Sequence, residues 1–215
     1  MNIMFWINSL IKYWSASFYD FLLWASFPER KIKKTMISYT DFLPAQNVLD
    51  YGCGTGTLLL MLKRKFPEIN LTGIDISQKM VGLAKYKIKK ENLEVPVFKY
   101  DGKTLPFPDN SFEKIVSSFV FHHLSTTGKR DALKELYRVL KTDSQLCITD
   151  FGKGKNLFTR LSFQIMRLLD GYENTLANAK GLIPQFITET GFKNIKQKQV
   201  FNAVWGSVYI WVASK

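Results

Sequence analysis

The chain has 215 residues, of which 46% are apolar and 22% charged, and this length and composition predict one folded domain with a buried core. Its formal charge of +12 at pH 7 favours acidic partners such as nucleic acid or an anionic membrane surface. The lysines, however, are spread over polar helical stretches and form no arginine-rich patch interleaved with aromatic residues. This distribution disfavours a nucleic-acid-binding protein.

The two cysteines, Cys53 and Cys147, belong to no Cys/His spacing of a metal site or of a disulfide framework. We therefore expect no metal site and a reducing, cytoplasmic location. The N-terminus lacks the basic region and the small-residue cleavage site of a secretory signal.

Residues 1–27 are rich in aromatic residues, but Lys12 and Asp20 interrupt the apolar run. They are therefore a poor transmembrane span, which needs about 20 mainly apolar residues. Two interpretations stay open: a helical lid over a substrate pocket or the core, and an amphipathic helix in a membrane interface, helped by the basic run from Arg30 to Lys34. The second interpretation predicts that the protein sediments with anionic liposomes and that deletion of residues 1–27 abolishes this binding.

Beyond this segment, a helix is predicted over residues 29–42, and strands then alternate with helices. Apolar runs predict strands at residues 47–51, 70–75, 95–100, 112–117 and 145–150. The helices between them are predicted at residues 57–66, 78–90 and 129–140. This alternation indicates right-handed βαβ units and a parallel sheet. In the tail we expect helices at 157–169 and 184–190, then an antiparallel hairpin of strands 193–204 and 206–213 at the sheet edge.

Three glycines, Gly52, Gly54 and Gly56, connect the first of these strands to its helix. Such a turn lets backbone N–H groups approach a ligand closely. Thr57 occupies the position of the third glycine of a dinucleotide-binding turn, and no P-loop lysine follows. Asp75, about 20 residues further on, ends the second strand, where a carboxylate can accept both hydroxyls of a ribose. The turn therefore predicts a nucleoside ligand.

Residues 48–56 resemble the first motif of the class I S-adenosylmethionine-dependent methyltransferases. Residues 71–77 resemble the second motif of that family, and Asp101-Gly102 with residues 105–112 resemble the third. Residues 117–124 and 135–141 complete the pattern. The similarity is closest to the branch that includes ubiquinone/menaquinone-biosynthesis methyltransferases.

The resemblance implies a Rossmann-like, doubly wound α/β fold, whose seven-stranded sheet is mostly parallel with an antiparallel last strand. The single domain would comprise an N-terminal helical cap (1–43), a cofactor-binding core (44–150) and helices with a C-terminal hairpin (151–215). The implied cofactor is S-adenosyl-L-methionine, with S-adenosyl-L-homocysteine as product.

The resemblance also assigns cofactor-binding roles. Asp50 would lie near the methionyl ammonium, Asp75 at the ribose and Ile76 on the adenine face. Asp101 would bind the adenine amino group, and Tyr19 matches a tyrosine of an N-terminal helix that folds over the cofactor. The full implied set is Asp50, Gly52, Cys53, Gly54, Gly56, Asp75, Ile76, Asp101, Gly102, Ser118 and Tyr19.

His122 and His123 follow the fourth strand, at the sheet edge where ligands of open α/β folds bind. Either imidazole could act as a general base for a hydroxyl substrate. Alternatively, the pair belongs to a helix start, with one ring packed and one exposed. A base is also dispensable in many methyl transfers, because the sulfonium already activates the methyl group.

We therefore expect a methyltransferase that acts on O, N or C of a small, apolar or amphiphilic acceptor. The acceptor class follows from the aromatic N-terminal segment and from Phe119, Phe121, Phe151 and Phe158 near the predicted mouth. Two alternatives are a catalytically silent cofactor-binding scaffold and a membrane-surface lipid or quinone methyltransferase anchored by its N-terminal helix. The protein would be cytoplasmic, with peripheral contact to an anionic membrane in the second case.

Overall fold

The computed structural model describes residues 28–215. Residues 1–27 of the predicted N-terminal helical cap (1–43) and the predicted site residue Tyr19 therefore lie outside the described residues. Within the described part, no helix has the length and apolar content needed to cross a bilayer.

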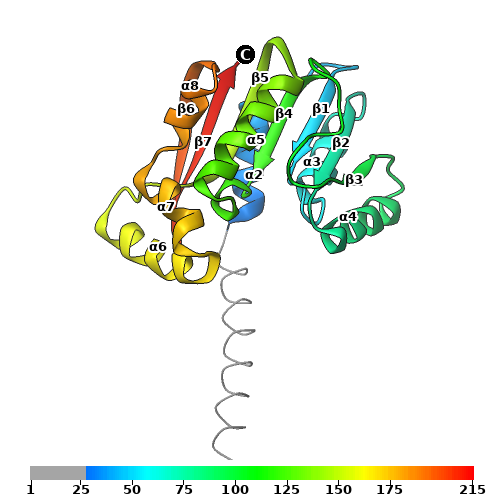
Figure 1. The fold of residues 1–215 in the computed structure, drawn as a ribbon. Helices are drawn as coiled ribbons and strands as arrows, with labels where there is room; N and C mark the ends of the chain where they lie inside the picture. Colours follow the sequence, from blue (N-terminus) through cyan, green and yellow to red (C-terminus); the bar gives the residue numbers. More distant parts are fainter. Residues whose placement is uncertain (1–27) are drawn as a thin grey trace, which may run out of the picture.

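A seven-stranded sheet forms the centre of the molecule, in the order β3-β2-β1-β4-β5-β7-β6 (Figure 1). Its strands are β1 (Asn47–Tyr51), β2 (Asn70–Asp75), β3 (Val97–Lys99), β4 (Phe112–Ser118), β5 (Leu140–Gly152), β6 (Lys193–Ala203) and β7 (Gly206–Ser214). The pairs among β1 to β5 are parallel, whereas β7 lies antiparallel between β5 and β6. The predicted Rossmann-like topology and the antiparallel last strand are confirmed.

Helices cover both faces of the sheet, as the alternation predicted. They are α2 (Glu29–Ser38), α3 (Thr57–Lys65), α4 (Gln78–Lys90), α5 (Thr126–Val139), α6 (Leu157–Asp170), α7 (Tyr172–Lys180) and α8 (Ile183–Glu189), with a 3₁₀ turn, η1 (Phe121–His123). One apolar cluster joins the sheet to α5 and α8, and the other joins it to α2, α3 and α4. Figure 1 shows α5 and α2 on opposite sides of the sheet, and α6 with α7 at one end of it.

Local sequence explains where the helices at the strand ends begin. The Ser77 side chain accepts a hydrogen bond from the Met80 N–H and caps α4, whose buried residues Val81, Ala84 and Ile88 recur at helical spacing. Ser125 caps α5 in the same way by accepting from the Gly128 N–H. Because these caps fix the first helical turns, they also fix the loops that precede them at the sheet edge.

Several boundaries differ from the prediction. Helix α2 ends at Ser38, four residues early, and α7 was not predicted because its buried residues Thr175, Ala177 and Asn178 are small or polar and give no apolar stripe. Strand β5 starts directly after α5 at Leu140, and its pairing with β4 is irregular there, with Asp143 at a positive φ of 57°. The extra β5 residues form a bulge rather than an isolated turn.

Candidate active site

A cavity of ≈ 920 Å³ opens at the carboxyl ends of the parallel strands. Its walls come from the loops after β1, β2, β3 and β4, from the end of β5, from the β6–β7 turn, from the start of α2 and from the end of α6. The lining residues are Glu29, Lys33, Tyr51, Gly52, Cys53, Gly54, Thr55, Asp75, Ile76, Met80, Tyr100, Ser118, Phe119, Val120, His122, His123, Leu124, Phe151, Met166, Asp170 and Trp205.

The glycine turn after β1 forms one wall of the cavity. Gly52 has φ +71°, and a Cβ there would lie 2.3 Å from a methyl carbon of Val120. Gly54 has φ +53°, and a Cβ there would meet nothing within 4 Å. The positive φ and the close approach to Val120 therefore both require glycine at position 52, whereas the absence of a Cβ at Gly54 leaves open space beside the turn.

Asp75 ties this turn to the end of β2. Its carboxylate accepts hydrogen bonds from the Gly54 N–H at 2.9 Å and from the Ser77 N–H at 2.8 Å. The next residue, Ile76, leaves 56% of its surface exposed on the cavity wall. An anchored carboxylate thus lies beside an apolar surface, as recognition of a ribose and a base requires.

Asp50, on β1, is a buried carboxylate without a hydrogen-bond partner among the described residues. Burial raises its pKa to about 7, and the charge of Asp75 adds to this effect while Lys33 opposes it. The Lys33 ammonium lies 2.5 Å from a carboxylate oxygen of Glu29. A buried carboxyl with both oxygens unsatisfied is costly unless a cation approaches it, so this side of the cavity favours a cationic ligand.

The structure brings most, but not all, of the predicted cofactor residues to the cavity wall. Gly52, Cys53, Gly54, Asp75, Ile76 and Ser118 line it. Asp50, Gly56, Asp101 and Gly102 do not. Asp101 is exposed and accepts hydrogen bonds from the Lys103 and Thr104 N–H groups of its own turn, which lower its pKa. A Cβ on Gly102 would lie 3.4 Å from Ile76, so this turn packs behind the apolar wall.

The opposite wall is largely apolar and is formed in part by Phe119, Phe151 and Met166. The rings of Phe119 and Phe151 lie 5.8 Å apart. Of the four phenylalanines predicted near the mouth, these two line the cavity, whereas Phe121 is fully buried and Phe158 is 63% exposed on α6. This wall suits an apolar or aromatic ligand.

Between the two walls lies His122, a buried imidazole held by a carboxylate. Its Nδ1 is 2.8 Å from Asp150, at the end of β5. Asp150 also accepts hydrogen bonds from the Phe121 and Phe151 N–H groups at 2.7 Å, and Asn178 of α7 donates to the Phe151 carbonyl at 2.8 Å. Because Asp150 accepts, Nδ1 carries the hydrogen, and in the neutral imidazole Nε2 keeps its lone pair.

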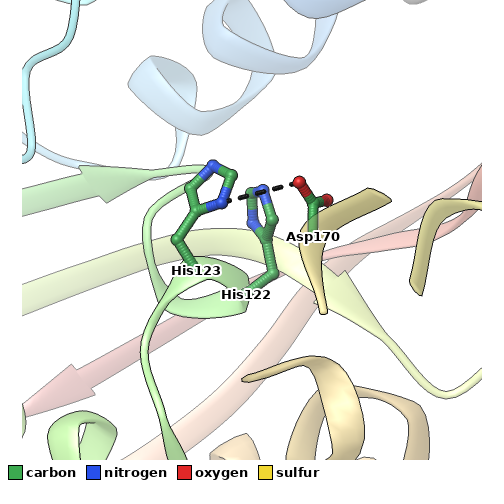
Figure 2. A group of neighbouring side chains, drawn as sticks. All are labelled: His122, His123 and Asp170. Carbon is green, nitrogen blue, oxygen red and sulfur yellow. Dashed lines mark ion pairs between the residues drawn. The ribbon is translucent and has the colours of Figure 1, made fainter. Parts of the chain in front are cut away.

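His123 follows on the same turn, with a side chain that is 58% exposed. Its ring centroid lies 3.9 Å from that of His122, and its Nδ1 is 3.7 Å from a carboxylate oxygen of Asp170 at the end of α6 (Figure 2). Partial burial and the neighbouring His122 lower its pKa, while Asp170 and Asp150 act in the other direction. The pair thus consists of one packed ring and one exposed ring.

Comparison with known proteins matches this arrangement to a family. Residues 48–143 match the model of a methyltransferase domain. The chain is 37% identical over 106 residues to a demethylmenaquinone methyltransferase of Thermus thermophilus, a match that covers 49% of this chain and 47% of that protein. It is 29% identical over 183 residues to a demethylmenaquinone methyltransferase of Lactobacillus johnsonii, covering 80% of this chain and 72% of that protein. The first of these matches spans about half the length of the relative.

A solved structure, a SAM-dependent methyltransferase from Aquifex aeolicus, is similar in fold, with a TM-score of 0.66 and 23% identity over 88% of this chain and 94% of that chain. The domain match, the sheet order and the glycine turn agree. Residues 48–143 are therefore similar to a methyltransferase domain, and the fold is that of the S-adenosylmethionine-dependent methyltransferases.

Several residues in or next to the cavity were not predicted from the sequence. Asp150 ends a predicted strand, and that position is a signal, because strand ends meet at the ligand edge. Lys33, Asn178 and Asp170 carry no such signal. They reach the site from α2, α7 and α6 through packing between distant segments.

Proposed function

We propose that this protein transfers the methyl group of S-adenosylmethionine to a hydroxylated, amphiphilic acceptor of the quinol type. The proposal rests on one observation: a single cavity has two walls of different chemical character. The glycine turn, Asp75 and Ile76 form one wall, and apolar side chains next to His122 form the other. Such a cavity can hold a nucleoside cofactor and an apolar acceptor side by side.

The first wall fits the cofactor, together with the buried Asp50 that directly precedes the lining residues Tyr51 and Gly52. The unsatisfied carboxylate of Asp50 suits the cationic methionyl end, and the open space beside Gly54 admits the ligand close to the backbone. We assign the ribose hydroxyls to Asp75 and the adenine face to Ile76, with Asp101 and Gly102 behind that surface. When bound, the cofactor supplies an activated methyl group and a neutral thioether as leaving group.

The acceptor class rests on the second wall and on the relatives. The two relatives described above are named for methylation of demethylmenaquinone, a quinone. The apolar wall of Phe119, Phe151 and Met166 suits a prenylated aromatic ring of this kind. We therefore propose a reduced quinone as acceptor, bound with its ring against these side chains and a hydroxyl towards His122.

His122 would accept the proton of that hydroxyl. Its Nε2 is the nitrogen with a lone pair, and Asp150 holds the ring and stabilises the imidazolium that forms. Removal of this proton would raise the electron density of the acceptor ring. A ring carbon would then take the methyl group as the bond to the thioether sulfur breaks, and loss of the C–H proton from that carbon to solvent would restore the aromatic ring. His123 lies on the same wall but lacks a comparable carboxylate contact, so we assign the base to His122.

Helix α6 offers a surface for contact with the membrane in which a prenylated quinone would dissolve. Five large apolar side chains of this helix are 47% to 72% exposed: Leu157, Phe158, Leu161, Ile165 and Leu168. At 100° per residue they span an arc of about 100°, opposite to Met166, which lines the cavity. Residues 153–180 carry five lysines and arginines against two acids, which favours an anionic surface. We propose that the protein lies peripherally on the cytoplasmic face of a membrane.

Calorimetric titration with S-adenosylmethionine tests the cofactor site. We expect binding to the wild type and at least about tenfold weaker binding to Asp75→Ala, because the ribose loses its acceptor. Asp143→Asn, a change of an exposed carboxylate outside the cavity, is the matched control. An unchanged affinity in Asp75→Ala would contradict the assignment.

Production of S-adenosylhomocysteine with a reduced demethylmenaquinone tests the acceptor. The expected result is turnover that depends on the acceptor and falls about 10²- to 10⁴-fold in His122→Asn. Cofactor binding without turnover on any quinol would instead indicate a silent cofactor-binding scaffold, the alternative that the sequence leaves open.

Sedimentation with vesicles that contain phosphatidylglycerol tests the membrane surface. We expect the double variant Leu161→Glu/Leu168→Glu to lose binding, because two charges would enter the acyl boundary. Leu43→Glu is the matched control, since Leu43 is 58% exposed on another part of the surface. A variant lacking residues 1–27 separates the contribution of that segment. Equal sedimentation of the double variant and the wild type would refute a role for α6.

A further inference from the structure

One group of side chains in the cavity has the composition of a metal site. A nitrogen of His122, a nitrogen of His123 and a carboxylate oxygen of Asp170 all lie within 4.8 Å of one another. Figure 2 shows the two rings on the same turn, with Asp170 facing them from the end of α6. We propose that these three residues bind a divalent transition-metal ion, of the class of Zn²⁺, Co²⁺ and Ni²⁺, in the acceptor half of the cavity.

The ligand set selects this class of ion. Two imidazoles and one carboxylate are the three protein ligands of several zinc sites that keep a further position open, and of related iron sites. Mg²⁺ and Ca²⁺ instead prefer all-oxygen ligands. Because His122, His123 and Asp170 line the cavity, the open positions of the ion would face its interior. The sequence alone led us to expect no metal site, because neither cysteine belongs to a metal-ligand spacing. Asp170 lies 47 residues after His123, so these residues form no local ligand motif either.

The hydrogen bonds that hold the His122 ring are those expected of a metal-binding histidine. A metal-binding imidazole almost always donates its other N–H to a carboxylate, which fixes the tautomer and the orientation of the ring. Asp150 accepts this hydrogen bond from Nδ1 at 2.8 Å and is held in turn by backbone N–H groups. Nε2 therefore has a free lone pair in a ring that cannot turn away.

The other two ligands have the freedom to adjust. Metal–ligand distances of about 2.1 Å place the ligand atoms of a tetrahedral site about 3.4 Å apart. Nδ1 of His123 and the carboxylate of Asp170 are already 3.7 Å apart, and their side chains are 58% and 21% exposed. Since all three ligand atoms lie within 4.8 Å of one another, closure around an ion shortens any of their separations by at most about 1.4 Å, and the more exposed side chains of His123 and Asp170 can supply this movement.

Binding of the ion has a consequence that rests on the proposed function. Nε2 of His122 has one lone pair, so it holds either a proton or a metal ion. In the metal-bound protein, the acceptor oxygen would contact the ion instead of the imidazole base. The binding itself needs neither cofactor nor acceptor.

Titration of the full-length protein, freed of metal by dialysis against a chelator and carrying no histidine tag, with Co²⁺ tests the proposal. Visible absorption of Co²⁺ intensifies when the ion leaves its octahedral water shell for a site of nitrogen and oxygen ligands. We expect one equivalent to bind, Zn²⁺ to displace it and Mg²⁺ not to. His123→Ala and Asp170→Asn should each weaken binding at least about tenfold.

Glu173→Gln is the matched control, because it changes an exposed acid three residues beyond Asp170 and should bind Co²⁺ as the wild type does. Circular dichroism verifies that each variant is folded, which the exposure of His123 favours. Absence of the Co²⁺ spectrum in the wild type, or equal affinity in both ligand variants, would overturn the proposal. Since no cofactor is present, this failure is distinct from failure of the methyltransferase assay.

Discussion

Asp50 is expected to couple cofactor binding to pH. In the free protein, burial holds its pKa at about 7, so about half of the molecules carry a neutral carboxyl at pH 7. A cationic methionyl end pairs with the ionised form, and its binding therefore displaces a proton. Affinity for S-adenosylmethionine should rise with pH up to about 7 and then level off.

The magnitude follows from the ionised fraction of Asp50. A pKa of about 7 gives an ionised fraction of about 0.03 at pH 5.5 and about 0.5 at pH 7.0, so the association constant should increase about 16-fold, or about 1.6 kcal/mol. Over this range the α-amino group of the ligand stays largely charged. Calorimetry at both pH values, in buffers of different ionisation enthalpy, measures the affinity and the proton release together.

Asp50→Asn supplies the decisive variant. It cannot ionise, so its cofactor affinity should be weaker than that of the wild type at pH 7.0 and nearly independent of pH, whereas Asp101→Asn should keep the slope. A wild-type affinity that does not change between pH 5.5 and 7.0 would refute the linkage. The free protein gives a second readout: because the folded pKa is raised, the wild type loses stability as pH rises from about 4 to about 7, by up to about 4 kcal/mol, and Asp50→Asn should not.

Two further substitutions test other parts of the site, and a third tests an ion pair elsewhere in the fold. Gly52→Ala should weaken cofactor binding at least about tenfold, because its φ of +71° and its approach to Val120 both oppose a Cβ; if Gly52→Ala/Val120→Ala regains full affinity, packing alone is at fault. His122→Asn should lower kcat about 10²- to 10⁴-fold with cofactor affinity nearly unchanged, as loss of a general base predicts, and a kcat close to wild type would exclude that role. Arg138→Ala should lower the free energy of unfolding by about 1–2 kcal/mol in urea denaturation, because the guanidinium makes two hydrogen bonds to Glu135 at 2.8 and 2.9 Å; no change in the midpoint would contradict this.

The cofactor half of the cavity was predictable because its signals are local. The apolar run of β1, the three glycines after it and Asp75 at the end of β2 all lie within 30 residues, and each has a backbone reason to be where it is. Parallel pairing then brings the strand ends together without further information. The same argument located His122 and His123 at the sheet edge.

The acceptor half depends on packing between distant segments. Helix α7 was missed because it buries small and polar residues, and yet Asn178 on this helix donates to the Phe151 carbonyl beside the site. Asp170 faces His123 only because α6 ends where Gly171, with φ +92°, turns the chain into α7. Periodicity cannot reveal these contacts, since each one joins a residue near a helix end to a strand end or a 3₁₀ turn more than 15 residues away.

The two interpretations of the histidine pair that the sequence left open are compatible in the structure. His122 is 3% exposed and His123 is exposed, which is the arrangement of a packed helix start. The Nδ1 atom of His122, however, donates to the carboxylate of Asp150. This hydrogen bond satisfies the polar atom of a buried ring, and it also orients Nε2 to take a proton or a metal ion. Packing and chemistry therefore require the same contact, so burial of His122 does not argue against its role. Only a measurement that depends on Nε2, such as the pH dependence of turnover or the Co²⁺ spectrum, can distinguish a purely structural role of His122 from a chemical one.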